Sequence, residues 1–374
     1  RRSADYVVRN GPETTQERWE EESGYSPSSI AAEIAGLACA GKLAIETGEE
    51  ADALVWLALA DHWTNEVEDW TATETGTERH DQVPYYVRVT RDGDPDAGNE
   101  RTLANGGPTL DERNVVDAGF LELVRLGIKP PDDPAIRNSL AAVDETIRVD
   151  LPQGVAFYRY NGDGYGERER GDQGGPWTAR AFGKGRLWPL LTGERGEYEL
   201  LSDTDDEALS PRALLETMAR LANSGRMLAE QVWDREYGTD YGWRLGEGTG
   251  AATPLAWAMA QYVRLAHGID AGEPVGTPAF VRERYLERRV HERERSPALR
   301  VDTRFRGDHI VFSGETTGAL VAMKTPTDVA VVEPEDGEFE CELEMVYGEN
   351  TVVVAAASER DLERASTTVR RFTL

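Results

Sequence analysis

The spacing of hydrophobic residues predicts a long helical region followed by a region of short strands. In the helical region, apolar residues recur three or four positions apart, which is typical of a helix with one buried face. Ser26 and Pro27 supply a cap and a first-turn proline, and Ile30 and Ile34 follow at helical spacing. The predicted helices are Ser26–Gly48, Glu49–Trp70, Val115–Gly127, Pro134–Ile147, Arg186–Leu201, Ser210–Asn223 and Pro254–Gly268.

Long loops rich in glycine, aspartate and aromatic residues connect these helices. Tyr158–Gly166 and Gly174–Gly185 are two of them, while Tyr85–Thr90 and Val155–Tyr160 have the composition of short strands. Long ordered loops on a helical scaffold usually carry function. Antiparallel helix pairs with large loops gathered at one end indicate a mainly α fold, a helical toroid rather than a compact bundle.

The pattern changes to period two in the last part of the chain. Phe339, Cys341, Leu343 and Met345 alternate with charged residues, as in half-buried strands. The predicted strands are Leu299–Phe305, His309–Ser313, Ala319–Met323, Val329–Val332, Glu338–Met345, Thr351–Ala356 and Thr367–Thr373. We therefore expect a helical domain over residues 1–290 and a small β-sandwich over 291–374, joined through the charged segment 282–295.

The charge composition points to a high-salt environment. The chain has 69 acidic and 41 basic residues and a net charge of −28. Lysine occurs only at Lys42, Lys129, Lys184 and Lys324, and every other basic residue is arginine. At molar salt the Debye length is about 3 Å, so the self-repulsion of such a chain is screened. We interpret the protein as halophilic, from a high-salt cytosol or an extracellular brine.

Composition also excludes several partners. Phosphate binding needs a basic stripe, and the densest arginine run, 282–295, is interleaved with glutamate, so nucleic acid is not expected as a partner. No apolar run approaches the ~20 residues of a membrane span, so no membrane partner is expected. Cys39 and Cys341 lie far apart in sequence, which argues against a disulfide framework.

Two glutamates beside tryptophans are the candidate chemistry. Glu20 follows Trp19 and precedes Glu21, and Glu230 ends a helical run just before Trp233. Inverting sugar hydrolysis needs one carboxylic acid to protonate the leaving oxygen and one carboxylate to activate water, with the two roughly 6.5–9.5 Å apart. Nearby indoles would supply an apolar platform for the sugar and exclude water. The alternative is that each glutamate is a solvated surface carboxylate, as most acidic residues in such a chain are.

Several sequence motifs resemble those of glycoside hydrolase family 15, the glucoamylases and glucodextranases. They are QERWEEESGYSPSSIAAEIAGL, VVDAGFLELVRLGIKPPDDP, YRYNGDGYGE, GRLWPLLTGERGEYEL, MLAEQVWD and GTGAATPLAWAMAQYVRL. The resemblance implies an (α/α)6 toroid with its active site at one end. The tail words GETTGA, DGEFE and YGENTV are similar to the Ig-like module that follows the catalytic domain in glucodextranases.

The resemblance also implies roles for individual residues. Matched position by position, Glu20 would be the general acid, with Glu21 as second candidate, and Glu230 the general base. Glu21 would accept from a sugar hydroxyl, and Trp19 would line the glucose pocket. Arg159 would contact the sugar, although it could instead pair with an acid such as Asp163. The sequence leaves Trp233 open between sugar contact and core, whereas it favours the core for Trp188 and Trp257.

By the same resemblance, the early helices of the toroid are missing from this chain. The expected function is exo-acting, inverting release of β-glucose from the non-reducing ends of α-glucans or maltooligosaccharides, with α-1,4 preference. The alternatives are glucodextranase-like α-1,6 specificity and a catalytically silent, truncated carbohydrate-binding protein. A partner could supply the missing half of the barrel. No cofactor is expected to be required. A structural calcium ion stays compatible with the acidic residues 203–207, although a solvated loop is the simpler interpretation.

The charge composition predicts salt-dependent stability. We expect the melting temperature, measured by calorimetry, to rise when dilute buffer is replaced by molar KCl, because salt screens the repulsion among surface carboxylates. Full activity together with an unchanged melting temperature in dilute buffer would rule out this interpretation.

Overall fold

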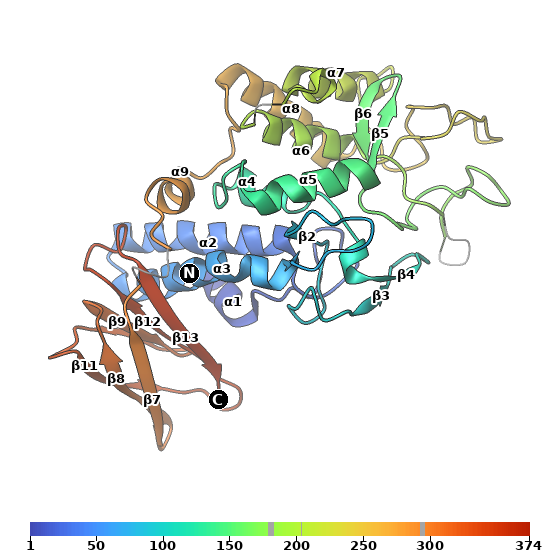
Figure 1. The fold of residues 1–374 in the computed structure, drawn as a ribbon. Helices are drawn as coiled ribbons and strands as arrows, with labels where there is room; N and C mark the ends of the chain where they lie inside the picture. The colour runs from blue at the N-terminus through green and yellow to red at the C-terminus, as the bar shows by residue number, and fades with distance from the viewer. Residues whose placement is uncertain (179–182, 203, 292–295) are drawn as a thin grey trace.

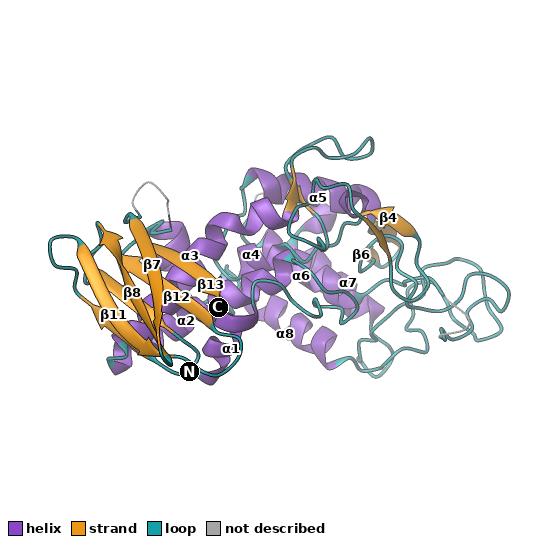
Figure 2. Cartoon of the chain, turned by 90° about the horizontal axis from the view of Figure 1, so that it is seen from below, coloured by secondary structure: helices purple, strands orange, loops and turns teal. Residues whose placement is uncertain are grey.

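The computed structural model describes residues 1–178, 183–202, 204–291 and 296–374 (Figure 1). A helical part and a β-sandwich lie side by side, and the long loops gather at the end of the helical part that is remote from the sandwich (Figures 1 and 2). The α-helices are α1 (Arg2–Asn10), α2 (Pro27–Thr47), α3 (Glu50–Thr71), α4 (Leu121–Arg125), α5 (Pro134–Thr146), α6 (Pro189–Glu199), α7 (Pro211–Leu221), α8 (Ala256–Ala271) and α9 (Ala279–Arg282).

The helices form two layers. Helices α2, α4, α6 and α8 pack successively against one another in a row, while α3 packs against α2, and α7 packs against α6 and α8. The loops that precede α2, α6 and α8 lie at the same end (Figure 1). Three short hairpins decorate that end: β1 (Ala72–Thr73) with β2 (Tyr85–Tyr86), β3 (Glu100–Thr102) with β4 (Thr109–Asp111), and β5 (Arg148–Leu151) with β6 (Gly154–Phe157).

Most predicted elements are present, but the predicted helix Val115–Gly127 is wrong in its first half. Only Leu121–Arg125 is helical. The residues before it are held extended by contacts to other segments: Arg88 N–H donates to the Val115 carbonyl and Val116 N–H donates to Asn161. Apolar spacing could not reveal this competition. The predicted strand Tyr85–Thr90 is likewise confined to Tyr85–Tyr86, and α1 was missed because its charged start has no cap signal.

Helix α2 corrects the expectation that no apolar run is long enough to cross a membrane. By length and composition alone, Pro27–Thr47 would suffice. Half of its apolar window is nevertheless buried inside the protein, and α2 packs along α3 and against α4. The helix begins at Pro27 and ends at Gly48, whose φ of 78° provides a left-handed C-cap.

The C-terminal part consists of two packed antiparallel sheets. One sheet has the strand order β10-β9-β12-β13 and the other β11-β8-β7. Their strands are β7 (Leu299–Arg306), β8 (His309–Thr316), β9 (Leu320–Lys324), β10 (Val329–Val332), β11 (Glu338–Glu344), β12 (Thr351–Ala357) and β13 (Thr367–Thr373). Ile310, Phe312, Met323 and Val354 are among the residues that fill the space between the sheets.

The four-stranded sheet is buried on both faces because α3 packs against its outer side. Along β12, Val352 and Val354 point into the sandwich, whereas Val353 and Ala355 join the core formed with the helices. A helix covered by α2 on one side and by a sheet on the other should be apolar all round, and α3 is so over residues 53–60, where every residue is buried. The sandwich and the helical part therefore share one hydrophobic core.

A buried ion pair lies in this shared interface. Arg284, in the π-helical turn η3 (Glu283–Glu287), donates to both oxygens of Asp61 on α3, at 2.8 and 2.7 Å. Thr367 of β13 donates to the same carboxylate at 2.6 Å, and Arg284 also donates to the carbonyl of Ala365. These contacts tie three segments together, and both charges are satisfied by several hydrogen bonds, as buried ions require.

Glu33 on α2 is a buried carboxyl group without such compensation. Its Oε2 atom is buried and has no hydrogen-bond partner among the described residues. Burial raises the pKa of Glu33 to about 7, and the positive charge of Arg371 only partly opposes the rise. At neutral pH, the fold therefore holds a carboxyl group close to its titration midpoint.

This environment predicts that stability falls as pH rises. The pKa of Glu33 in the folded protein lies above its ordinary value of 4.5, so the folded state binds more protons between about pH 4.5 and 7. Glu33→Gln should remove this dependence, making the variant more stable than wild type at pH 8 by about 3 kcal/mol and equally stable below pH 4.5. Urea unfolding at constant high salt measures the difference. Parallel stability–pH curves for the two proteins would contradict the prediction.

Candidate functional site

Glu20 lies in a tight turn between α1 and α2. The turn is closed by Glu17 N–H donating to the Glu22 carbonyl and by Glu20 N–H donating to the Glu17 carbonyl. Glu20 itself has a φ of 60°, in the left-handed region that non-glycine residues seldom adopt. Its side chain is exposed, whereas Trp19 before it is only 7% exposed. A strained, exposed carboxylate in an otherwise buried turn is a common feature of functional sites.

The Glu21 carboxylate accepts hydrogen bonds from four side chains. Arg159 and Asn105 donate to Oε1, each at 2.7 Å. Arg88 donates to Oε2 at 3.0 Å, and the Tyr160 hydroxyl donates to the same oxygen at 2.5 Å. A carboxylate has about four acceptor positions, so these donors fill them. A sugar hydroxyl could bind Glu21 only by displacing one of the four.

Trp19 packs in a cluster of aromatic rings and guanidinium groups. Its ring lies 5.3 Å from Trp188 and 5.8 Å from Trp257, and the Arg18 guanidinium lies 4.7 Å from its centre. Arg18 in turn donates to Glu194 on α6 at 2.6 Å. The indole N–H of Trp19 donates to the buried Asp117. These contacts attach the Glu20 turn to α6 and α8.

Trp188 is a core residue, whereas Trp257 is partly exposed. Trp188 is 5% exposed and belongs to the core, as predicted. Trp257, at the start of α8, is 40% exposed, so the expectation that it is a core residue is wrong. Its ring contacts Trp19 and lies 5.3 Å from the Arg18 guanidinium, and the rest of the side chain is exposed.

Arg159 is positioned by two carboxylates. Nε and Nη2 donate to Asp163 at 2.8 Å each, and Nη2 also donates to Glu21. The pairing with Asp163 that the sequence left open is therefore present, and Asp163 is buried rather than a surface acid. The remaining nitrogen, Nη1, makes no hydrogen bond within the described part of the chain, so one donor stays available to a ligand.

Glu230 lies in an extended segment before α8. Its N–H donates to the Ala252 carbonyl at 2.8 Å, and Val232 bridges to both Leu187 and Gly248. The Glu230 carboxylate lies near the Tyr165 hydroxyl, and its oxygen Oε1 accepts from Gln231 at 3.5 Å. Burial, with a further contribution from the charge of Glu230, raises the pKa of Tyr165 to about 12. Tyr165 is therefore neutral at neutral pH.

Arg159 connects the two glutamate segments. Its guanidinium lies 5.0 Å from the centre of the Tyr165 ring and 5.1 Å from that of Trp19. Arg159 thus lies between Glu21 and Tyr165, and Tyr165 lies near Glu230. The two segments, about 200 positions apart in sequence, are neighbours in the fold, while the separation of the Glu20 and Glu230 carboxyl groups stays a prediction.

Trp233 does not lie where a sugar could reach it. The indole is completely buried, the Arg186 guanidinium lies 4.2 Å from its centre, and its N–H donates to the Tyr237 carbonyl. The expected sugar contact of Trp233 is therefore replaced by a core position. The sequence analysis assigned Glu230 to the end of a helical run, in which a residue three positions on shares its face; the segment is extended instead, so Trp233 points to the opposite side.

Sequence reasoning missed Arg88, Asn105, Tyr160 and Tyr165. All four contact a predicted site residue, but three lie in irregular segments that have no periodicity. Tyr160 and Tyr165 stand in the word YRYNGDGYGE beside Arg159, so that word contained a signal for them. Arg88 and Asn105 had none.

Comparison with known proteins shows the family of this chain. The family model described as Glycosyl hydrolases family 15 matches residues 1–267. The chain belongs to this family. A glucoamylase from Clostridium sp. (strain G0005) is 42% identical over 283 residues, covering 76% of this chain and 37% of that protein. The crystal structure of a bacterial glucoamylase complexed with acarbose aligns with a TM-score of 0.68 and 42% identity, covering 76% of this chain and 39% of that one. The family 15 chain thus spans less than half the length of these relatives.

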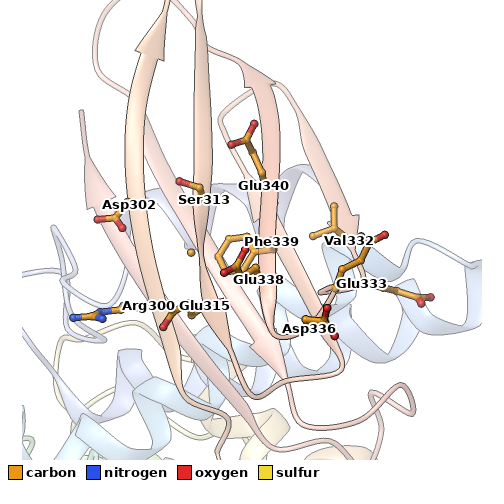
Figure 3. Close-up of a pocket in the computed structure, with 12 residues that line it drawn as sticks. Arg300, Asp302, Ser313, Glu315, Val332, Glu333, Asp336, Glu338, Phe339 and Glu340 are labelled. Atoms are coloured by element: carbon orange, nitrogen blue, oxygen red, sulfur yellow. The ribbon is translucent and has the colours of Figure 1, made fainter.

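A groove of this family 15 protein lies on the sandwich. A groove of about 1030 Å³ runs along the outer face of β7, β8 and β11 (Figure 3). Carboxylates dominate its lining, including Glu315, Glu338 and Glu340, with Arg300 as the one basic residue in the lining. Ligand pockets are mostly apolar with a few polar groups, and this groove is the reverse. It also lies at the other end of the molecule from the Glu20 turn (Figure 1).

No group of three or more His, Cys, Asp or Glu side chains suited to a metal ion occurs within residues 1–178, 183–202, 204–291 and 296–374. Asp203, part of the acidic segment considered for calcium, lies outside the described residues. The polar groups described at the family 15 site are carboxylates, guanidinium groups, tyrosine hydroxyls and the Asn105 amide.

The strain at Glu20 predicts a stability gain from glycine. Glu20→Gly should be about 1 kcal/mol more stable than Glu20→Gln, because glycine adopts a positive φ without steric cost. Glutamine is the matched control, since it removes the charge but keeps the Cβ atom. Urea unfolding of the two variants measures the difference. Equal stability would show that the turn is not strained at this residue.

Proposed function

We propose that this protein acts as an exo-acting α-glucosidase that releases β-glucose from the non-reducing ends of α-glucans with inversion. The observation that carries the proposal is the chain of neighbours from Glu21, in the Glu20 turn, through Arg159 and Tyr165 to Glu230. It supports a common site for the two segments whose glutamates the family resemblance assigns to acid and base. The glucoamylase relatives support the glycosidase class.

In the proposed mechanism, Glu20 and Glu230 have separate tasks. Glu20, exposed and free to approach a ligand, donates a proton to the glycosidic oxygen. Glu230 takes a proton from the water that attacks the anomeric carbon from the opposite face. Tyr165, whose neutral hydroxyl lies near Glu230, would help to orient that carboxylate. Inversion requires room for this water, with carboxyl groups roughly 6.5–9.5 Å apart.

The remaining site residues would bind the sugar. The exposed part of the Trp257 side chain beside Trp19 would form the apolar platform, and the unengaged Nη1 of Arg159 would donate to a hydroxyl. Glu21 would accept from a hydroxyl in exchange for the Asn105 amide.

We propose α-1,4 linkages and maltooligosaccharides as substrates, with α-1,6 linkages as the alternative. No required cofactor is proposed. A structural calcium ion and an Ig-like relationship of the sandwich remain proposals.

A silent carbohydrate-binding protein is the second candidate function. It is favoured by apolar side chains that stay exposed at the two ends of the helix row: Leu43 on α2 is 62% exposed, and Val263 on α8 is 53% exposed. In a toroid, further helices would cover these faces. We propose that a partner segment carrying the early helices completes the site.

Glucose release from maltotetraose and isomaltotetraose in molar KCl tests the proposal. We expect release from maltotetraose, with β-glucose as the first product by ¹H NMR, and a loss of at least about 10³-fold in Glu230→Gln, because the water then lacks its base. Release from isomaltotetraose alone would favour the α-1,6 alternative.

Titration calorimetry with maltose separates the second candidate. Binding without turnover by a folded chain would favour a silent binding protein. Adding a segment that supplies the early helices should then restore release. α-Glucose as the first product would contradict inversion.

A further inference from the structure

One buried side chain holds both ends of the turn that carries Glu20. Arg88 follows strand β2, and its side chain is fully buried. A single atom, Nη2, donates to Glu17 Oε1 at 2.8 Å and to Glu21 Oε2 at 3.0 Å. These two carboxylates flank Trp19 and Glu20. Glu17 uses its other oxygen to accept from the Trp19 N–H at 2.9 Å.

The position of Arg88 is set independently of the turn. Its guanidinium carbon lies 3.6 Å from the centre of the Tyr160 ring, and its N–H donates to the Val115 carbonyl. Nε and Nη1 are buried and have no hydrogen-bond partner within the described residues. The stack on Tyr160 and the backbone contact therefore fix the guanidinium, and only Nη2 acts on the turn.

Removing this cation would leave the Glu17 carboxylate without a cation in a nearly dry environment, beside Glu21, which would keep its hydrogen bond from Arg159. The side chains of Glu17 and Glu21 are 1% and 10% exposed. Unpaired buried charges are strongly unfavourable, and like charges repel each other. The two ends of the turn would separate, and the left-handed conformation at Glu20, which costs free energy by itself, would be lost.

We propose that Arg88 is a positioning residue for Glu20: through Glu17 and Glu21 it holds the strained turn that presents this carboxylate to the substrate. The inference rests on the proposed role of Glu20 as the acid. It adds a residue that does not touch the substrate but determines where the acid stands.

Arg88→Met and Arg88→Lys form the central comparison. Methionine keeps much of the length of the stem but lacks the cation, so amide hydrogen exchange of a peptide spanning residues 17–22 should accelerate at least about tenfold. Lysine supplies the one nitrogen that the turn needs, so exchange should stay within about threefold of wild type. If the protein releases glucose, Arg88→Met should lower kcat about 100-fold and leave KM nearly unchanged. Arg88→Lys should keep most of the wild-type kcat.

Arg284→Met is the matched control, because Arg284 is equally buried but lies in the interface with the sandwich. It should lower the melting temperature without changing exchange at residues 17–22 or the ratio of kcat to KM. If Arg88→Met does not fold, Glu17→Ala removes one arm of the bridge and should accelerate the same exchange.

Slow exchange at residues 17–22 in Arg88→Met, or equal impairment of Arg88→Lys and Arg88→Met, would overturn the proposal. The exchange measurement needs no turnover, so it decides the role of Arg88 even for a chain that releases no glucose. A failure of Glu230→Gln to abolish release would instead count against the proposed function and leave the exchange result standing.

Discussion

Compensation of buried carboxylates by arginine is the interaction on which the site depends. The turn around Glu20 contains Glu17, Glu21 and Glu22, and each is engaged by a guanidinium group from another segment. Acidic residues outnumber basic ones in this protein, whose net charge is −28, yet several arginines lie in the interior at this turn. Without them, burying this many carboxylates beside one another would be prohibitive.

The same principle joins the sandwich to the helical part. Arg284 donates to Asp61, and the Lys324 ammonium group of β9 donates to the Asp52 carboxylate on α3 at 2.6 Å. Lys324 is one of the four lysines in the chain. Guanidinium groups bind carboxylates through two parallel hydrogen bonds and are less strongly hydrated than ammonium groups, which suits them to buried pairs. The preference for arginine that suggested a halophilic surface therefore also serves the interior.

Sequence reasoning succeeded where one apolar face decides the structure and failed where polar contacts between loops decide it. The face of α2 with Ile30 and Ile34, and the alternation along β11, were both predicted. Helix α4 was predicted too long, because hydrogen bonds to Arg88 and Asn161 hold the preceding residues extended. At the site, the family motifs identified Glu20, Glu230 and Arg159 as candidates. The partners of Glu21 could not be predicted, since Arg88 and Asn105 come from segments with no pattern.

The three residues Trp19, Glu20 and Glu21 show why a strained turn is useful here. Trp19 and Glu21 are both directed into the protein, where one is packed between aromatic rings and the other is saturated by four donors. A strand could also expose a residue between two inward neighbours, because its side chains alternate between faces, but it could not close the turn from Glu17 to Glu22. The left-handed conformation at Glu20 turns its side chain outward while both neighbours stay anchored. The strain thus separates the residues that hold the turn from the single residue that is left free for chemistry.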